Sequence, residues 1–66
     1  MKYKIGDKFK PKGRTFSTII YEVTAKEYSP YKNETLYSLE LTVPPTGHII
    51  YGLSEDTLNA NYIKIN

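Results

Sequence analysis

The sequence predicts an all-β domain built from five short strands. Over residues 35–43, apolar and polar side chains alternate with a period of two, as they do in a half-buried strand. No stretch of ten or more residues has the i, i+3, i+4, i+7 apolar spacing of an amphipathic helix. The chain has 66 residues, too few for two independent cores, so residues 1–66 are expected to form a single domain.

The first two strands are predicted near the start of the chain. Residues 7–10 form the first strand, with Phe9 pointing inward between Lys8 and Lys10. Residues 19–26 form the second strand, because their side chains alternate and are rich in the β-branched and aromatic types that strands prefer.

The second and third strands are expected to pair as an antiparallel hairpin. Their connection, residues 29–34, contains Pro30, whose φ is fixed, and Asn33, which tolerates a left-handed backbone conformation. This composition predicts a loop longer than the tight two-residue kind, leading into the strand at residues 35–43.

A second reversal follows the third strand. The two prolines at residues 44–45 cannot donate hydrogen bonds to a sheet, and a Thr-Gly pair at residues 46–47 completes a turn. The chain should therefore return as a fourth strand over residues 48–53.

A short helical turn and a last strand complete the domain. Ser54 is a candidate N-cap, and two acidic residues follow it in the first turn, where the positive end of a helix favours them. Asn59 and Asn61 indicate that only about one turn forms, so we predict a short 3₁₀ turn. Residues 62–65 then form the fifth strand.

The alternation pattern also predicts which side chains form the core. The expected core residues are Phe9, Tyr21, Val23, Leu39, Leu41, Ile49, Leu53, Leu58 and Ile63.

The layout of these elements resembles that of SH3-like small β-barrels of the bacterial or phage Tudor or KOW type, over nearly the whole chain. The resemblance rests mainly on Gly6-Asp7-Lys8-Phe9, similar to the entry of such domains, and on the Leu-Ser-Glu-Asp-Thr-Leu segment at residues 53–58. It implies a five-stranded SH3-like barrel with a short 3₁₀ turn before the last strand. The chain has no Trp and no Ala-Leu-Tyr-Asp-Tyr segment, which argues against recognition of proline-rich peptides. It also lacks the second, glycine-rich half of the KOW motif, so ribosomal or elongation-factor roles do not carry over.

Several kinds of chemistry lack the residues they need. The chain has no Cys and one His, so it offers no disulfide, no thiolate and no Cys-based or all-His metal site. No Ser-His-Asp constellation and no phosphate-binding glycine loop is present. We therefore expect no metal, no cofactor and no enzymatic activity. No signal peptide and no membrane span is evident either, so a cytoplasmic location without membrane contact is expected.

Charge is distributed unevenly along the chain. Residues 1–14 hold six basic residues and one acidic residue, a net charge of +5, whereas residues 15–66 hold three basic and six acidic residues, a net charge of −3. Lysines that alternate on one strand form a stripe suited to a phosphate backbone. Lysines on an edge strand also protect against aggregation, so the stripe by itself does not decide the partner.

The seven tyrosines are the most unusual feature of the composition. Tyr21, Tyr37 and Tyr51 are expected on inward or barrel-seam positions. The other four fall on termini, loops or outward positions with no core to join: Tyr3, Tyr28, Tyr31 and Tyr62. Exposed tyrosine can stack on nucleic-acid bases, and it is equally enriched in protein-protein interfaces.

Two functions follow as hypotheses. The first is a non-enzymatic small binding module with weak nucleic-acid binding, in which lysines hold phosphates and tyrosines stack on bases. The alternative is a protein-interaction module, such as a small phage or mobile-element factor acting on a host protein. The candidate nucleic-acid or partner-binding residues are Lys8, Lys10, Lys12, Arg14, Tyr28, Tyr31 and Tyr62.

Overall fold

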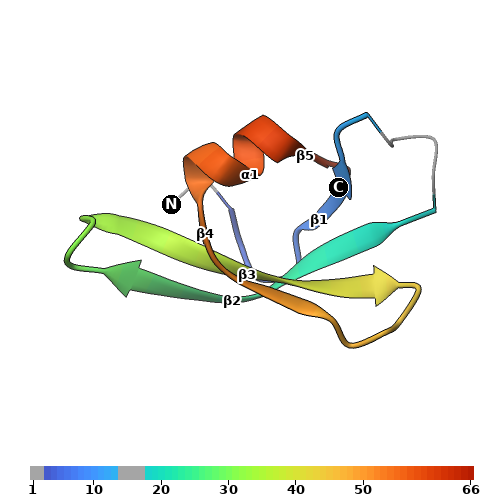
Figure 1. The fold of residues 1–66 in the computed structure, drawn as a ribbon, viewed down its shortest axis with the longest axis horizontal. Helices are drawn as coiled ribbons and strands as arrows, with labels where there is room; N and C mark the ends of the chain where they lie inside the picture. The colour runs from blue at the N-terminus through green and yellow to red at the C-terminus, as the bar shows by residue number, and fades with distance from the viewer. Residues whose placement is uncertain (1–2, 14–17) are drawn as a thin grey trace.

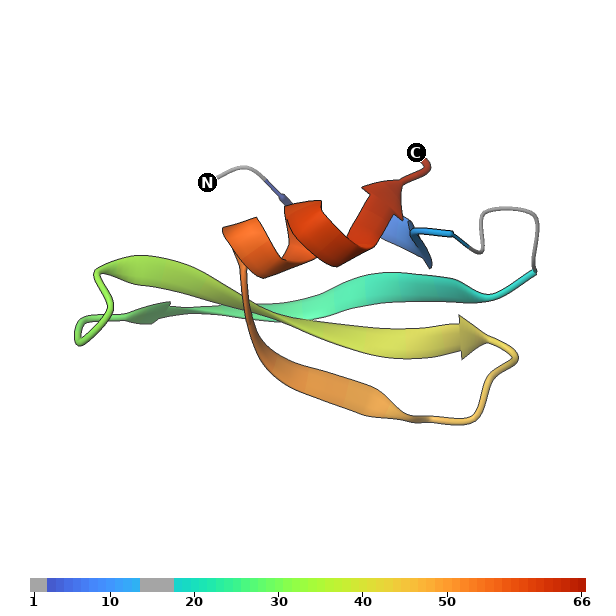
Figure 2. The ribbon, with the colours of Figure 1, turned by 45° about the horizontal axis from the view of Figure 1, so that its top comes forward.

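The computed structural model describes residues 3–13 and 18–66, which form one antiparallel sheet with a short helix over one face (Figures 1 and 2). Its elements are β1 (Lys8–Pro11), β2 (Ile20–Ser29), β3 (Glu34–Val43), β4 (Ile49–Ser54), α1 (Glu55–Asn61) and β5 (Tyr62–Lys64). The strands lie in the order β4-β3-β2-β1-β5, and every neighbouring pair is antiparallel. The prediction of an all-β fold with five strands is confirmed.

The β2–β3 hairpin is the longest feature of the sheet. Each strand has ten residues, and the pairing runs from Ile20 opposite Val43 to Ser29 opposite Glu34. β2 thus continues three residues beyond its predicted end. The loop between the strands contains Asn33 at φ 53°, so this residue takes the left-handed conformation expected of it.

β4 is paired with β3 through an irregular register. Tyr37 lies opposite Leu53 and Leu39 lies opposite Ile50, so β4 has one residue more than β3 between these two pairs. Gly52 has φ 70°, a conformation that glycine adopts without steric cost and that is typical of a β-bulge.

The first and last strands of the chain pair with each other. β5 lies beside β1, with Phe9 opposite Lys64 and Pro11 opposite Tyr62. β4 and β5 are the two ends of the sheet order, and no hydrogen-bonded strand pairing joins them within the described residues. The helix α1 connects these two edges and packs against β3, β4 and β5.

The prediction of a single 3₁₀ turn is wrong, because α1 is an α-helix of seven residues. Ser54 caps it as expected: its Oγ accepts a hydrogen bond from the backbone N–H of Thr57 at 3.1 Å. Asn61, which was expected to limit the helix, donates from Nδ2 to the carbonyl of Thr57 at 3.0 Å. The side chain of Leu58, a residue of this helix, is fully buried, and its packing stabilises a second helical turn.

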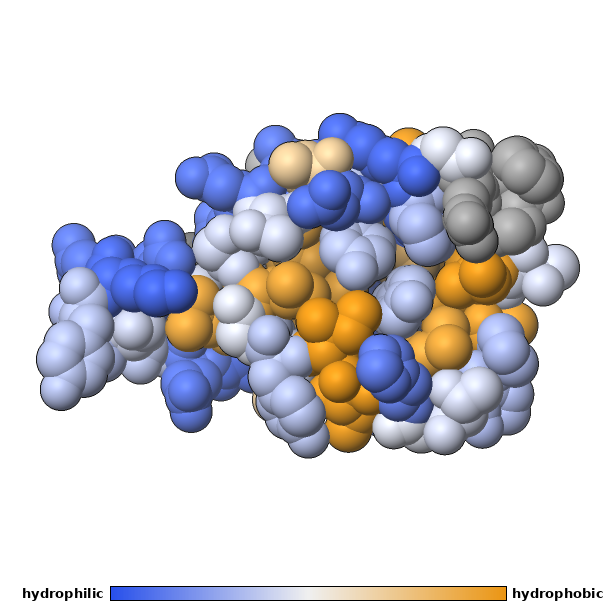
Figure 3. Space-filling view, in the orientation of Figure 1, coloured by the Kyte–Doolittle hydropathy of each residue, from blue (hydrophilic) through white to orange (hydrophobic). Residues whose placement is uncertain are grey.

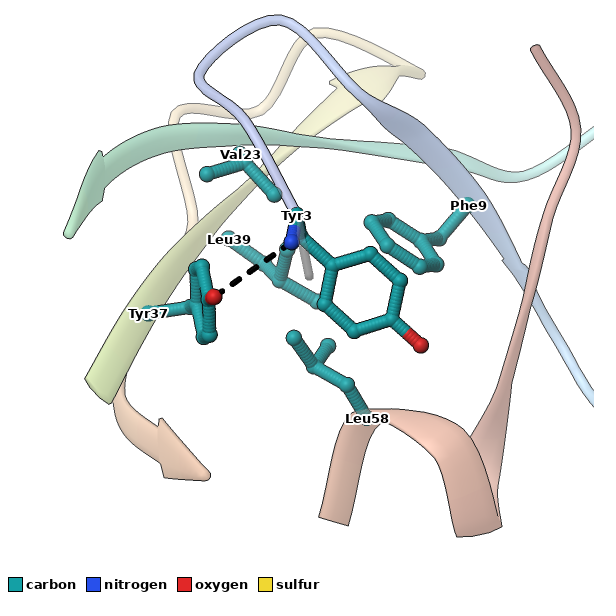
Figure 4. Close-up of a cluster of buried hydrophobic side chains, with 6 residues drawn as sticks. All are labelled: Tyr3, Phe9, Val23, Tyr37, Leu39 and Leu58. Atoms are coloured by element: carbon teal, nitrogen blue, oxygen red, sulfur yellow. Dashed lines mark hydrogen bonds between the residues drawn. The ribbon is translucent and has the colours of Figure 1, made fainter. Parts of the chain in front are cut away.

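The core lies between the sheet and α1 and consists of Tyr3, Phe9, Val23, Tyr37, Leu39 and Leu58 (Figure 4). Four of these were expected to be core residues from the alternation pattern, and the burial of Tyr37 agrees with its inward assignment. Tyr21 and Leu53 pack partly against the cluster. Leu41 and Ile49 are only half-buried.

Four assignments to the core or the surface are wrong, and one of them is Tyr62, which was expected to have no core to join but packs partly against the core. Ile63 is 40% exposed, because it lies opposite Lys10, on the side of β1 away from the buried Phe9. Tyr51 is 73% exposed, since it lies at the bulge of an edge strand. Tyr3 was expected to be exposed near the terminus, but it is 5% exposed.

A turn at residues 4–7 explains the burial of Tyr3. The Asp7 carboxylate accepts a hydrogen bond from the backbone N–H of Lys4 at 2.9 Å, and the backbone N–H of Asp7 donates to the carbonyl of Lys4 at 3.0 Å. The reversed chain places the ring of Tyr3 edge-on to Phe9 and Tyr37, with centroid distances of 5.1 and 5.7 Å. Asp7 is itself buried, so its role is to fix this turn.

Candidate interaction surfaces

The lysines of β1 lie on the side of the sheet away from the core. Lys8 is exposed and Lys10 is half-buried, and they alternate with the fully buried Phe9 as the sequence predicted. Lys12 is exposed in the turn that follows β1, and Lys64 lies on the neighbouring strand β5. Arg14 lies outside the described residues.

Carboxylates lie close to this stripe of lysines. Lys8 is opposite Glu22, Glu22 is opposite Glu40, and Glu40 is opposite Ile49, so one row crosses four strands. Like charges directly opposite one another on an antiparallel pair repel. The two glutamates also reduce the positive potential that Lys8 would present to a phosphate.

Two candidate tyrosines lie on the projecting end of the β2–β3 hairpin. Tyr31 is 100% exposed and Tyr28 is 57% exposed. The Tyr28 hydroxyl donates a hydrogen bond to Oδ1 of Asn33, and the backbone N–H of Lys32 donates to Oγ of Ser29 at 3.4 Å. These bonds across the loop order the turn that presents the two rings.

Tyr62 differs from the other candidates because it joins the core in part. It is half-buried, and its ring lies edge-on to Tyr21 at a centroid distance of 5.6 Å. Burial, and secondarily the charge of ionised Tyr21, raises the pKa of the Tyr62 hydroxyl above its usual value of 10.0. Because the folded state retains this proton when the unfolded chain has lost it, stability is expected to fall as the pH rises above 10.0.

The structure does not bring the lysine stripe and the hairpin tyrosines together. The hairpin projects from one end of the molecule, whereas β1 and β5 lie toward the other (Figure 1), and the longest dimension is 36 Å. Among the candidate aromatic residues, Tyr62 is the one beside the lysines, since it is paired with Pro11.

Two hollows, neither identified from the sequence, adjoin the base of the hairpin. One, of about 300 Å³, is lined by Glu34, Thr35, Glu55 and Asp56. The other, of about 280 Å³, is lined by residues of β2, β3 and β4 that include Tyr51 and Gly52. The first lies between β3 and α1 and the second among β2, β3 and β4, so residues distant in sequence form both and no local pattern indicates them.

Within residues 3–13 and 18–66, no group of three or more His, Asp or Glu side chains is arranged to hold a metal ion. The helix in this part of the chain is too short to cross a membrane. Comparison of the chain with protein-family models, curated proteins and solved structures finds no match.

Proposed function

We propose that this chain is a non-enzymatic protein-interaction module and that the tip of its β2–β3 hairpin is the contact surface. The observation that supports this proposal best is the full exposure of Tyr31 on a hairpin that projects beyond the core. Tyrosine is enriched among the residues that dominate binding energy at protein interfaces. The hairpin end, residues 26–34, has two lysines and two glutamates, so it has no net charge to attract a polyanion.

The fixed conformation of the hairpin loop favours binding through this surface. The hydrogen bond between Tyr28 and Asn33 and the left-handed backbone of Asn33 hold the turn in one conformation. A pre-ordered loop loses less conformational entropy when it binds. We propose that this module is a small phage or mobile-element factor that acts on a host protein.

The fold that we propose for the module is the SH3-like small barrel. Five antiparallel strands, a long β2–β3 hairpin and a helical segment before the last strand support it. An experimental structure in which α1 does not bridge the edges of β4 and β5 would contradict this assignment.

Removing both hairpin rings should abolish partner binding and leave the fold intact. In the double variant Tyr28→Ser with Tyr31→Ser, we expect recovery of the partner from a host extract to fall at least about ten-fold, because each hot-spot aromatic contributes about 2 kcal/mol or more. The measurement is a quantitative pull-down with the immobilised chain. Ile5→Ser, which removes an apolar side chain that is 60% exposed and lies outside the hairpin, is the matched control and should retain the partner. Equal recovery with the double variant and with the wild-type chain would contradict the proposal.

Nucleic-acid binding is the second candidate function, and the observation that favours it is the gathering of lysines on β1 and β5. Lys8, Lys10 and Lys12 belong to β1 and its following turn, with Lys64 on the adjacent strand. Tyr62 is the ring placed to stack on a base beside them, and Arg14 remains a candidate phosphate contact. In this second candidate function, the protein binds single-stranded DNA or RNA with weak sequence preference.

Salt dependence tests this second candidate. If three or four phosphates are neutralised, the logarithm of affinity for single-stranded DNA or RNA should fall against the logarithm of salt concentration with a slope of about −2 to −3. The double variant Lys10→Glu with Lys12→Glu should flatten this slope and weaken binding to all sequences alike. The measurement is a fluorescence-anisotropy titration of random-sequence oligonucleotides at about 50 mM salt, where electrostatic binding is strongest. Absence of binding at concentrations up to about 100 μM would contradict this second candidate. Edge protection would not replace it, because β1 lies between β2 and β5 and is not an edge strand.

A further inference from the structure

Among the described residues, β4 is an edge of the sheet that has a β-bulge at Gly52 but none of the charged side chains that usually protect such an edge. Its one hydrogen-bonded neighbour in the strand order is β3, and its six residues, Ile-Ile-Tyr-Gly-Leu-Ser, carry no charged side chain. The opposite edge, β5, has three residues and includes the exposed Lys64. Soluble proteins usually shorten or charge their edge strands, because an unpaired edge is a template for another strand. The two edges of this sheet are therefore not equivalent.

The surface beside β4 can receive a side chain. The hollow of about 280 Å³ lies where Ala25, Ser38 and Gly52 have small side chains or none. Leu36, Tyr51 and the oppositely charged pair Lys26 and Glu27 also line it. The bulge at Gly52 interrupts the ladder there, and the Tyr51 ring is largely exposed. In the space-filling view, apolar surface gathers over the middle of the molecule around β4, and hydrophilic surface covers the hairpin end (Figure 3).

Carboxylates flank β4 at both of its ends. At the start of the strand, Glu40 lies directly opposite Ile49, with Glu22 next to it across the sheet. Beyond the end of the strand, Glu55 and Asp56 follow in sequence and line the hollow of about 300 Å³ together with Glu34. An uncharged edge between two acidic regions is complementary to a strand that is uncharged in its middle and basic near its ends.

We propose that the β4 edge binds an extended segment of another protein, which adds to the sheet as a sixth strand and carries Lys or Arg near both of its ends. In this binding mode, main-chain hydrogen bonds contribute affinity and pockets for alternate side chains contribute specificity. The span from Ile49 to Glu55 corresponds to about 20 Å of extended chain at about 3.3 Å per residue, so a segment of about seven residues reaches both acidic regions. Pairing with β4 of a second copy is disfavoured, because the same carboxylates would then meet one another.

This site is separate from the hairpin tip, so it does not depend on the proposed function. The probe is a fluorescein-labelled, end-blocked peptide, Lys-Val-Thr-Val-Thr-Val-Lys, titrated with the whole chain at about 50 mM salt, where screening is weak. We expect a dissociation constant below about 1 mM, and binding at least about ten-fold weaker for the same peptide with glutamate at both ends. A peptide with proline at its centre, which lacks a backbone N–H and cannot complete the ladder, should not bind.

Variants of the chain locate the binding surface. Tyr51→Lys places a charge on the edge and should weaken binding of the lysine peptide at least about ten-fold, whereas Tyr31→Lys on the hairpin should change it less than about two-fold. The double variant Glu34→Gln with Asp56→Asn should weaken the lysine peptide about three- to ten-fold and strengthen binding of the glutamate peptide, because like-charge repulsion is removed. Circular dichroism of each variant checks that the fold is retained. Bound peptide should also slow hydrogen exchange of amides in β4 and not of those in β5.

Three results would overturn the proposal. Equal binding of the lysine and glutamate peptides would mean that charge does not select the occupant, and absence of binding by the lysine peptide would mean that the edge accepts no such strand. Self-association of the chain that Tyr51→Lys abolishes, detected by sedimentation, would assign the edge to a second copy. Because Tyr31→Lys alters the hairpin and Tyr51→Lys alters the edge, failure here is distinguishable from failure of the hairpin interface.

Discussion

Replacing Leu58 with alanine is expected to lower the free energy of unfolding by about 2–5 kcal/mol, the cost of truncating a fully buried leucine. Leu58 is the buried residue of α1 and closes the core from the side opposite the sheet. A domain of 66 residues has a total stability of about 3–10 kcal/mol at about 0.05–0.15 kcal/mol per residue. The substitution should therefore remove a large fraction of the free energy of unfolding and lower the urea midpoint.

Urea denaturation followed by far-UV circular dichroism measures this effect. Asn59→Ala is the matched control, because Asn59 is exposed on the same helix and alanine has the higher helix propensity. This control should change stability by less than about 0.5 kcal/mol or stabilise the domain slightly. A Leu58→Ala variant as stable as the wild-type chain would contradict the packing of α1 on the sheet.

The second large effect is expected from Tyr37→Phe, which removes one buried hydroxyl. This hydroxyl donates to Oε2 of Glu55 at 2.9 Å. It also accepts a longer hydrogen bond from the backbone N–H of Tyr3 at 3.4 Å, the dashed line in Figure 4. Its loss removes a hydrogen bond to a carboxylate, a kind that contributes about 1.5–3 kcal/mol, together with the longer bond to Tyr3. The change should lower the urea midpoint without changing the dependence of unfolding free energy on urea concentration.

Tyr51→Phe is the control for this second effect, because it removes the hydroxyl of a largely exposed tyrosine. Its expected effect is below about 0.5 kcal/mol. If the two Tyr→Phe variants unfold at the same urea concentration, the Tyr37 hydroxyl does not link the segment around Tyr3 to the start of α1.

The strands could be predicted because their signal is local. Alternation in β3 depends on the sequence of one segment, and tertiary packing did not override it; Tyr37 and Leu39 are both fully buried. The left-handed Asn33 is likewise a property of one residue type in a turn. The stripe of Lys8 and Lys10 followed from the same alternation around Phe9.

The errors arose where distant residues decide the outcome. The length of α1 depends on how Leu58 packs against a sheet formed by earlier parts of the chain, which outweighs the low helix propensity of asparagine. Burial of Tyr3 depends on a turn whose local signs were Gly6, at φ 98°, and Asp7, a residue that bonds readily to nearby backbone N–H groups. The two hollows depend on which strands become neighbours, and a single segment does not contain that information.

Pairing of β1 with β5 has a consequence for how the chain folds. The β2–β3 hairpin joins residues that are close in sequence, whereas Phe9 and Lys64 meet from opposite ends of the chain. Contacts of large sequence separation form late, because the entropy of closing a long loop must be lost before they contribute. We therefore expect a hairpin-first order of folding, in which β1 joins through its pairing with β2 and β5 is the last strand to join the sheet. During synthesis, this order would leave the outer side of β1 unpaired until β5 has left the ribosome.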